Sequence, residues 1–359
     1  MKPKVIDLFA GVGGLSLGFE NCGFDVILAN EYDPAIATAY KINHKETRMI
    51  VGDITTLDLE TTFSSYEGKV DVIIGGPPCQ GFSQKGQRKT IHDERNFLFK
   101  YYVKVVDLVK PHYFLMENVP NLLTAEGGYF RKEIEDLFNS MGYQLNMGVL
   151  NASDYGVPQN RRRAVIIGKR GGSAPALPEP KNVLVTIWDA ISDLAYLSSG
   201  EGSEEQEYRF EPQSEYQKNL RNGCCVLYNH IATKHSELAL KRLAMIPPNA
   251  GKEVLPEEHL TKSIYSGTWT RMRKDEISVT ITTRFDTPSS GKFTHPFLNR
   301  AITVREAARI QSFPDSFIFV GNKGSQMKQV GNAVPPLLAE AIAGAIMNDI
   351  EEDRKNEQT

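Results

Sequence analysis

The sequence predicts an α/β fold, in which a mostly parallel β-sheet carries helices on both faces and a more irregular segment follows. Two observations predict it. Short runs rich in β-branched and aromatic residues recur through the first half of the chain, with helical patterns between several of them. Such alternation is typical of βαβ units. After about residue 171 the alternation stops, and 359 residues suffice for one large domain or two unequal ones.

Seven strands are predicted in the first half, at residues 4–9, 25–30, 48–52, 70–76, 112–118, 143–150 and 163–168. A helix is predicted after the second strand, because Asp33 supplies an N-cap acceptor and Pro34 suits the first helical position. Another helical pattern covers residues 98–109. Ligands of such sheets bind at the carboxyl ends of the strands.

The second half begins with "GGSAPALPEPKN", a predicted hinge, and is irregular to about residue 299. A helix follows at Thr303, which forms a capping-box pattern with Glu306. A final amphipathic helix is predicted at about 335–349, and it would have to flank the first strand. We therefore expect four segments: a catalytic and cofactor-binding domain at 1–174, a second domain at 175–299, a return segment completing the first domain at 300–349, and a disordered tail at 350–359.

Composition excludes several classes of protein. The net charge of −3 argues against a histone-like basic protein. No signal-peptide core and no apolar run of membrane length is found, so no membrane partner and a cytoplasmic location are expected. The four cysteines, Cys22, Cys79, Cys224 and Cys225, form no CxxC pair, which indicates a reducing compartment with neither a disulfide framework nor a metal site.

A cofactor is indicated by "DLFAGVGGLSLGFE", a strand, glycine turn and helix at residues 7–20. Glycines let backbone amides approach a ligand at a helix N-terminus. Glu31 ends the second strand and could accept hydrogen bonds from ribose hydroxyls, while Asp53 ends the third strand and could accept an adenine amino group. Each feature alone is ordinary, but three at successive strand ends favour an adenosine-bearing cofactor. A nicotinamide cofactor stays open on these features.

The chemistry is indicated by "GGPPCQGFS", in which two prolines stiffen the chain before Cys79. A thiolate can add to an electron-poor ring carbon. Sulfur added to C6 of a pyrimidine makes C5 able to attack a methyl donor, and N3 must be protonated as the sulfur adds. Glu117, in "FLMENVPNLL", ends another strand, and burial could raise its pKa and leave it a usable acid.

Three arginines open the last predicted strand in "QNRRRAVIIG". Strand alternation predicts Arg161 and Arg163 on one face and Arg162 on the other. Two guanidinium groups could hold cytosine O2, orient the glutamate or bind phosphate. Each of these motifs alone also has a structural interpretation: a buried cysteine, a helix-capping acid, a solvated basic face. Their joint occurrence at strand ends favours the catalytic interpretation.

With these motifs the sequence resembles the DNA (cytosine-5)-methyltransferases of bacterial restriction-modification systems. The matching blocks follow the family's order over about 1–170 and 300–345: "DLFAGVGGLSLGFE", "NEYDPAIATAY", "GDI", "GGPPCQGFS", "RNFLFKYYVKVVDLVKP", "ENVPNLL", "YGVPQNRRRAVIIG", "RAITVREAARIQSFPDSF" and "QVGNAVPP". Pro-Pro-Cys distinguishes carbon methylation from nitrogen methylation, whose enzymes carry an Asp-Pro-Pro-Tyr type motif.

The resemblance implies a Rossmann-like S-adenosylmethionine-dependent methyltransferase sheet with a smaller, irregular target-recognition domain at 175–299. It implies double-stranded DNA as substrate, base flipping, a monomer, and a cognate restriction endonuclease as an optional partner. Cys79 would be the nucleophile, Glu117 the N3 partner, and Arg161 with Arg163 the anion and base clamps. The implied cofactor-binding residues are Phe9, Gly11, Gly13, Gly14, Leu15, Glu31, Tyr32, Asp53, Ile54, Pro77, Leu98, Asn332 and Val334.

Basic charge is local. Residues 80–104 carry six basic and two acidic residues, a net of +4, and residues 231–310 carry thirteen and eight, a net of +5. These segments favour phosphate contacts over a merely solvated surface because they flank the proposed nucleophile. Residues 263–276 mix side chains suited to groove contacts, although a structural turn is an equal alternative. The DNA-contact candidates are Gln80, Ser83, Arg95, Arg271 and Arg273.

Three other functions compete. The first is the same reaction on RNA, such as tRNA, which the long variable segment disfavours. The second is a binding protein on a degenerate methyltransferase fold, which the intact Cys79, Glu117 and Arg161 argue against. The third is a nucleotide-dependent oxidoreductase, which would leave the "PPC" and "ENV" motifs unexplained.

Overall fold

The computed structural model describes residues 2–78, 97–261 and 266–356. The chain forms two compact units. Unit 1 comprises Met1–Asn151, Arg162–Lys181 and Pro336–Thr359, and unit 2 comprises Ala152–Arg161 and Asn182–Pro335.

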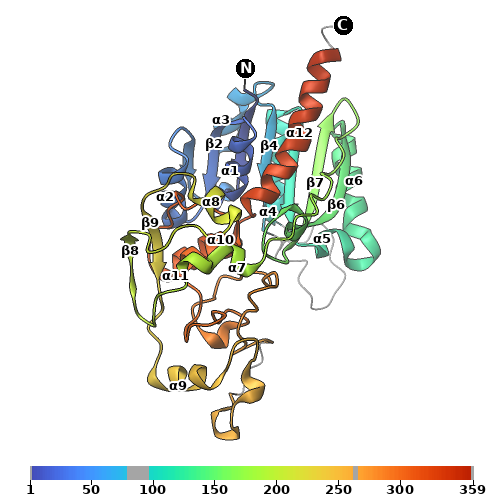
Figure 1. The fold of residues 1–359 in the computed structure, drawn as a ribbon. Coiled ribbons are helices and arrows are strands. Elements are labelled where there is room, and N and C mark those ends of the chain that lie inside the picture. The colour runs from blue at the N-terminus through green and yellow to red at the C-terminus, as the bar shows by residue number, and fades with distance from the viewer. Residues whose placement is uncertain (1, 79–96, 262–265, 357–359) are drawn as a thin grey trace. The chain divides into compact units, whose positions relative to one another are not determined.

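Unit 1 is built on a seven-stranded sheet with the order β3-β2-β1-β4-β5-β7-β6 (Figure 1). Its strands are β1 (Lys4–Leu8), β2 (Asp25–Glu31), β3 (Arg48–Val51), β4 (Val72–Gly75), β5 (Tyr113–Asn118), β6 (Tyr143–Asn151) and β7 (Arg162–Arg170). The first five strands pair in parallel, whereas β7 runs antiparallel to both β5 and β6. The prediction of a mostly parallel α/β sheet is confirmed.

The helices of unit 1 are α1 (Gly14–Asn21), α2 (Pro34–Asn43), α3 (Leu59–Phe63), α4 (Phe97–Val109), α5 (Asn121–Thr124), α6 (Tyr129–Ser140) and α12 (Pro336–Asn356). The start of α2 is as predicted, because the Asp33 carboxylate accepts the amides of Ala35 and Ile36. Helices therefore follow most of the parallel strands, as βαβ units require.

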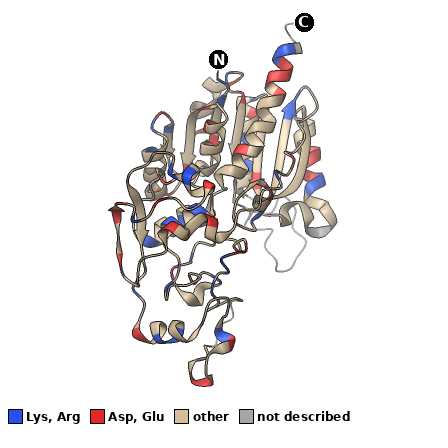
Figure 2. Cartoon of the chain, in the orientation of Figure 1, with Lys and Arg blue, Asp and Glu red and all other residues tan. Residues whose placement is uncertain are grey.

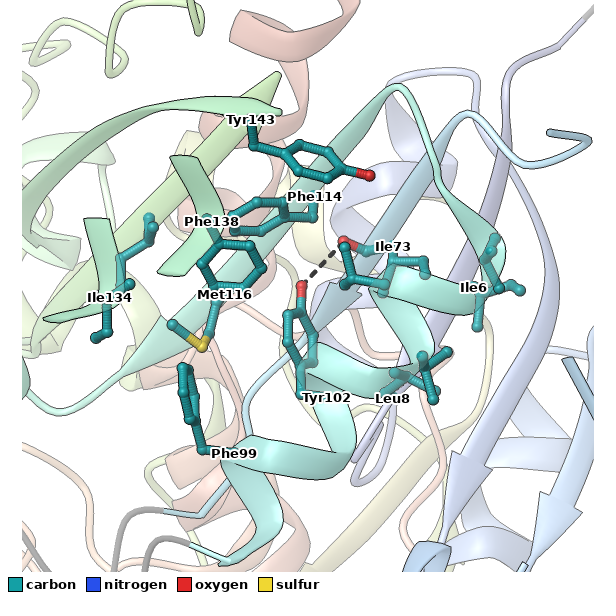
Figure 3. Close-up of a cluster of buried hydrophobic side chains, with 14 of the residues drawn as sticks. Ile6, Leu8, Ile73, Phe99, Tyr102, Phe114, Met116, Ile134, Phe138 and Tyr143 are labelled. Carbon is teal, nitrogen blue, oxygen red and sulfur yellow. Dashed lines mark hydrogen bonds between the residues drawn. The ribbon is translucent and has the colours of Figure 1, made fainter. Parts of the chain in front are cut away.

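The main core lies between one face of the sheet and helices α3, α4 and α6 (Figure 3). Alternate residues of β1 and β5 point into it, and aromatic rings from α4 and α6 pack against them. The ring of Phe114 stacks on that of Phe138, with centroids 4.2 Å apart. The Tyr102 hydroxyl, buried in this core, donates to the Leu115 carbonyl at 2.9 Å and also contacts that of Ile73. Buried rings of this size each contribute on the order of 2–3 kcal/mol to folding.

Helix α12 packs against α1 in the same unit. A Cβ at Gly18 of α1 would lie 2.6 Å from the amide nitrogen of Glu340, so only glycine permits this approach. Further along α12, Asp349 accepts the Tyr113 hydroxyl at 2.6 Å and pairs with Lys169 at 2.7 Å. The helix continues to Asn356, so residues 350–356 are helical rather than a disordered tail.

One helical stretch in the described part of the chain, Lys323–Asn356, has the length and composition of a membrane span. The apolar window of this stretch is 56% buried inside the protein, as expected for a core helix. It therefore gives only weak evidence for a membrane segment.

Unit 2 contains mostly short elements joined by irregular chain. They are α7 (Ile187–Ile191), β8 (Gly202–Gln206), α8 (Glu215–Arg221), β9 (Leu227–Ile231), α9 (Glu237–Met245), α10 (Val304–Ile310) and α11 (Lys323–Asn332). The predicted capping box of Thr303 and Glu306 is present at α10. Residues 300–335 belong to this unit, so the chain returns to unit 1 at Pro336 rather than at residue 300.

Buried arginines explain why residues 300–310 belong to unit 2. Arg309 pairs with Asp193 at 2.5 Å and with Asp315 at 2.7 Å, and all three side chains are inaccessible. Arg300 pairs with Glu306 at 2.7 Å. Burial opposes ionisation of Glu306, but the charge and hydrogen bonds of Arg300 outweigh it and lower the pKa of Glu306 to about 2. Cutting the chain at residue 299 would separate Arg309 from Asp193 and leave a buried charge without one of its partners.

Candidate active site

The glycine turn after β1 has a backbone that requires its glycines. Gly11 and Gly13 lie in the left-handed region, at φ of 56° and 95°. A Cβ at Gly13 would approach the Tyr40 ring to 2.9 Å, whereas the space around Gly11 is open within 4 Å. Phe9 also has a positive φ of 57°, which is uncommon for an aromatic residue. A strained residue close to a glycine with open space around it is typical of a ligand-binding turn.

Glu31 links this turn to the next strand end. Its Oε2 accepts the Gly11 amide and its Oε1 accepts the Asp33 amide, both at 2.9 Å. Burial raises the pKa of Glu31, and the amides of Asp33 and Gly11 act against that shift. Each carboxylate oxygen can accept more than one hydrogen bond, so Glu31 can also receive ribose hydroxyls.

The other cofactor candidates of unit 1 lie nearby in the fold. Asp53 follows β3, and its carboxylate caps the next turn by accepting the Thr55 amide at 2.9 Å. Tyr32, which is 68% exposed, follows Glu31, and Ile54 and Leu15 are buried. Two strand-end carboxylates beside an amide-rich glycine turn fit an adenosine-bearing donor.

The remaining candidates lie further along the chain. Gly14 opens α1, Pro77 follows β4, and Leu98 lies in the first turn of α4. Asn332 and Val334 lie at and just after the end of α11, in unit 2. Their cofactor contacts stay predictions.

The "GGPP" and "ENV" motifs meet in unit 1, although about 40 residues separate them in the sequence. A Cβ at Gly76 would lie 2.9 Å from Oε2 of Glu117, so the carboxylate rests directly against this glycine. The Asn118 side-chain amide donates to the Pro77 carbonyl at 2.9 Å. The hydrogen bond from Asn118 thus holds the proline turn, and the absence of a side chain at Gly76 leaves room for the Glu117 carboxylate next to that turn.

Arg163 completes this group. Its Nε lies 2.7 Å from Oε1 of Glu117, and the side chains of the two residues are 15% and 13% exposed. The pair is possible because β7 runs antiparallel to β5, which brings the start of β7 to the end of β5. The Glu117 carboxylate is therefore held between a guanidinium group and a glycine backbone.

Arg161 lies elsewhere. It precedes β7 and belongs to unit 2, where its buried guanidinium donates to the carbonyls of Ile281 at 3.2 Å and Gly331 at 2.9 Å. The prediction that strand alternation places Arg161 and Arg163 on one face stays a prediction, because β7 begins only at Arg162 and Arg161 lies outside the strand. Its partners indicate a structural role for Arg161.

Four predicted residues lie outside the described residues: Cys79, Gln80, Ser83 and Arg95. The described part of the chain stops at Pro78, directly before Cys79, and resumes at Phe97. Gly75 precedes this point at the end of β4, and a Cβ there would collide with the Leu8 carbonyl of β1. A side chain at either glycine of "GGPP" would therefore cause a clash, at Gly75 with the backbone of β1 and at Gly76 with the side chain of Glu117.

The two arginines predicted to contact DNA differ sharply. Arg271 is 2% exposed, and its five N–H groups donate to the carbonyls of Leu243, Ile246, His295 and Leu298 and to the side chain of Asn299. No donor is left for DNA, so this structure places Arg271 as a structural residue. Arg273 is exposed and makes only a surface pair with Glu276 at 2.9 Å, and it stays the DNA-contact candidate.

Charges of both signs lie over unit 2 (Figure 2), with acidic side chains along β8. Among the described residues of the segment 231–310, four basic residues are buried, namely Arg271, Arg300, Arg305 and Arg309. The sequence count therefore overestimates the basic surface. Within the described residues, no group of three His, Cys, Asp or Glu side chains could hold a metal ion.

Sequence reasoning missed two residues of this site, Gly76 and Asn118, and one buried acid in the strand before the glycine turn, Asp7. Asp7 is a fully buried acid in β1, and its place within an otherwise apolar strand run was a readable signal. Gly76 and Asn118 lie inside motifs that were identified, but their spatial contact depends on the pairing of β4 with β5.

Comparison with known proteins gives consistent matches. The family model for C-5 cytosine-specific DNA methylases matches residues 3–348. The Type II methyltransferase M1.HphI of Haemophilus parahaemolyticus is 40% identical over 97% of this chain and 87% of its own length. The Type II methyltransferase M.DdeI of Desulfomicrobium norvegicum is 39% identical over 96% of this chain and 88% of its own length.

Solved structures agree with the fold. A proposed DNA modification methyltransferase encoded within an E. coli prophage superposes with a TM-score of 0.77 at 29% identity, covering 97% of this chain and 99% of that one. The S. pombe Dnmt2 methyltransferase, at 17% identity, gives a TM-score of 0.58 over 97% of this chain and 99% of its own. The second likeness supports the fold alone.

Proposed function

Because this chain belongs to the C-5 cytosine-specific DNA methylase family and is a DNA (cytosine-5)-methyltransferase, we propose that it methylates C5 of one cytosine within a specific duplex sequence. The methyl donor in this proposal is S-adenosylmethionine, and the reaction passes through a covalent bond from Cys79 to a flipped-out base. The observation that carries the proposal is the meeting of Gly76 and Pro77 with Glu117, Asn118 and Arg163 at one sheet edge.

The donor would be held by the turn after β1 and by two strand-end acids. Glu31 takes the ribose hydroxyls, Asp53 with Ile54 takes the adenine edge, and Phe9 lies against the ring. Gly11, Gly13 and Gly14 of the turn lie near the methionine portion. When bound, the donor supplies the methyl group that C5 of the base accepts.

The chain's own residues activate the base. The Cys79 thiolate forms a bond from Sγ to C6 of cytosine while Glu117 provides the proton that N3 takes up. The electron pair released onto C5 makes that carbon nucleophilic. After methylation the C5 proton passes to a water molecule, the electron pair of that C–H bond re-forms the C5=C6 double bond as Sγ leaves C6 as a thiolate, and N3 returns its proton to Glu117. Arg163 keeps the Glu117 carboxyl in place through both proton transfers.

Sequence recognition is assigned in this proposal to unit 2, with Arg273 as one contact. The protein acts as a monomer in the cytoplasm, and a restriction endonuclease with the same target is its optional partner. RNA methylation is not favoured, since the family model describes DNA methylases and the relatives of highest identity given above are Type II enzymes.

Bisulfite sequencing of host DNA that expresses this chain tests the proposal. We expect one sequence context to become protected, and Cys79→Ser to abolish the protection while leaving donor binding nearly intact. Cys225→Ser is the matched control, because Cys225 is an exposed cysteine of unit 2. DNA with 5-fluorocytosine at the target should trap a covalent adduct, since fluorine blocks the elimination step. A serine variant with more than a few per cent of activity would contradict the nucleophile assignment.

A further inference from the structure

Asp7 is a buried acid whose charge nothing in the described structure balances. It lies in β1 with no exposed surface. Its Oδ2 accepts the Ser16 hydroxyl at 2.7 Å. Its Oδ1 is buried and has no hydrogen-bond partner among the described residues. A carboxyl group in this position has lost its hydration and gained one neutral hydrogen bond.

The charged groups around Asp7 are mostly acids. Glu20 of α1 and Glu31 of β2 both act on it unfavourably, while β4 contributes no titratable group. From α2, the Tyr40 hydroxyl lies 2.7 Å from Ser16 Oγ, and His44 is hydrogen-bonded to Glu20. Tyr102 of α4 also interacts electrostatically with Asp7.

Burial is the main reason that the pKa of Asp7 rises to about 8, with Ser16 opposing the shift and Glu31 adding to it. In the free protein near pH 7, Asp7 is therefore mostly a neutral acid. A cation placed nearby would stabilise the ionised form.

The position of Asp7 relates it to the cofactor turn. Phe9, the first residue of the left-handed turn, is two residues away, and Ser16 lies in the first turn of α1, directly after the glycines. Glu31, whose charge acts on Asp7, accepts the amide of Gly11 within the same turn. Asp7 is thus tied, through Ser16 and the short chain to Phe9, to both ends of the turn to which the donor is proposed to bind.

We propose that Asp7 is a charge-selecting residue for the cofactor: its carboxyl group gives up a proton when the sulfonium donor binds, and keeps that proton when the thioether product binds. The inference rests on the proposed donor, S-adenosylmethionine. This donor carries one positive charge more than S-adenosylhomocysteine, and the two molecules are otherwise alike in their charged groups. The proton passes from the carboxylic acid to the buffer, and the resulting carboxylate balances the sulfonium charge.

This linkage would favour donor over product. Each unit by which the donor lowers the pKa of Asp7 corresponds to about a tenfold gain in affinity for the donor relative to the product. At a pH below the pKa that Asp7 has in the donor complex, Asp7 stays protonated in every state, and the donor gains no affinity relative to the product. The gain is complete above pH 8, where Asp7 is ionised throughout. The donor-to-product affinity ratio should therefore rise with pH and level off near 8.

Titration calorimetry in phosphate and in Tris, which differ in ionisation enthalpy, measures the protons released on binding. At pH 7.5 the wild-type protein should release up to about one proton more with S-adenosylmethionine than with S-adenosylhomocysteine. Glu31 does not contribute to this difference, because both ligands carry the same ribose. Asp7→Asn should abolish the difference and make the affinity ratio independent of pH.

Ser16→Ala is the second variant, and it keeps the carboxyl group. Because the Ser16 hydrogen bond lowers the pKa of Asp7, its loss should move the proton release to higher pH. Equal proton release with both ligands in the wild-type protein would overturn the inference, as would a difference that survives in Asp7→Asn. If Asp7→Asn does not fold, an unshifted profile in Ser16→Ala overturns it. Failure of the wild-type protein to bind either ligand would refute the proposed cofactor itself.

Discussion

Replacing Gly76 by alanine perturbs the active site by a single methyl group. The added Cβ would lie 2.9 Å from Oε2 of Glu117. Non-bonded heavy atoms prefer separations of about 3.5 Å, so the carboxylate must move by roughly 0.5 Å. It cannot move freely, because Arg163 holds the other oxygen at 2.7 Å. Gly76 is not in the left-handed region, so the alanine backbone itself is not strained.

The expected result is a loss of rate with little loss of stability. A displacement of 1 Å in a catalytic group can cost about a hundredfold, so half that displacement should cost about tenfold, or about 1.4 kcal/mol of barrier. The free energy of unfolding should change by less than about 1 kcal/mol, since the clash is with the end of a flexible side chain. Donor binding should be unchanged.

Single-turnover methyl transfer from labelled donor to DNA measures the rate, and thermal unfolding measures the stability. Gly344→Ala is the matched control, because it adds the same methyl group in α12 where nothing lies within 4 Å. A Gly76→Ala enzyme with the wild-type rate would refute the placement of Glu117 beside the reacting base. A rate loss matched by an equal loss of folded protein would also refute it.

Three further outcomes are expected. Arg271→Ala should lower the free energy of unfolding by more than about 2 kcal/mol, because it removes five donated hydrogen bonds, including those to the buried carbonyls of Ile246 and His295. Arg273→Ala should leave stability unchanged and reduce the salt slope of DNA binding by about 1, as filter binding at several salt concentrations would show. Gly18→Val should destabilise unit 1 by about 2–3 kcal/mol in denaturant unfolding, since its side chain would collide with the backbone of Glu340; a wild-type midpoint would contradict the α1–α12 packing. Stability contributed by Glu306 should be complete above pH 4.5 and lost as pH falls towards 2, because its pKa is lowered in the folded protein, and Glu306→Gln should lack this acid-dependent part of the unfolding curve.

The sheet was predictable because strand patterns and turn residues are local signals. All seven strands lie where β-rich runs end at glycine, proline or polar residues, and α2 begins at Asp33 as its capping pattern indicates. The final helix was also predicted, but not its length, because residues 350–356 are highly charged and contribute little to an apolar face. Their helix is supported by Asp353, which pairs with Lys169, a contact that no local pattern reveals.

The arginines were the main failure, and the reason is physical. A sequence count treats each guanidinium as surface charge, but the same group can satisfy several buried carbonyls at once. Arg271 and Arg161 do this, and nothing in "RMRKDE" or "QNRRR" distinguishes them from their exposed neighbours. By contrast, the acid at position 7 is preceded by apolar residues, so its burial could have been inferred from strand alternation.

The buried arginines also explain how a unit with little regular structure stays ordered. Irregular chain leaves backbone carbonyls without helix or sheet partners, and a buried carbonyl must be paired. In unit 2, Arg305 donates to the carbonyls of Tyr228, Pro314 and Phe317, and Arg300 donates to that of Leu197. These donors come from the segment after residue 299, whereas several of their acceptors precede it. A recognition segment cut at 175 and 299 would therefore lose its internal partners, and an exchange that preserves them must run from about residue 182 to 335.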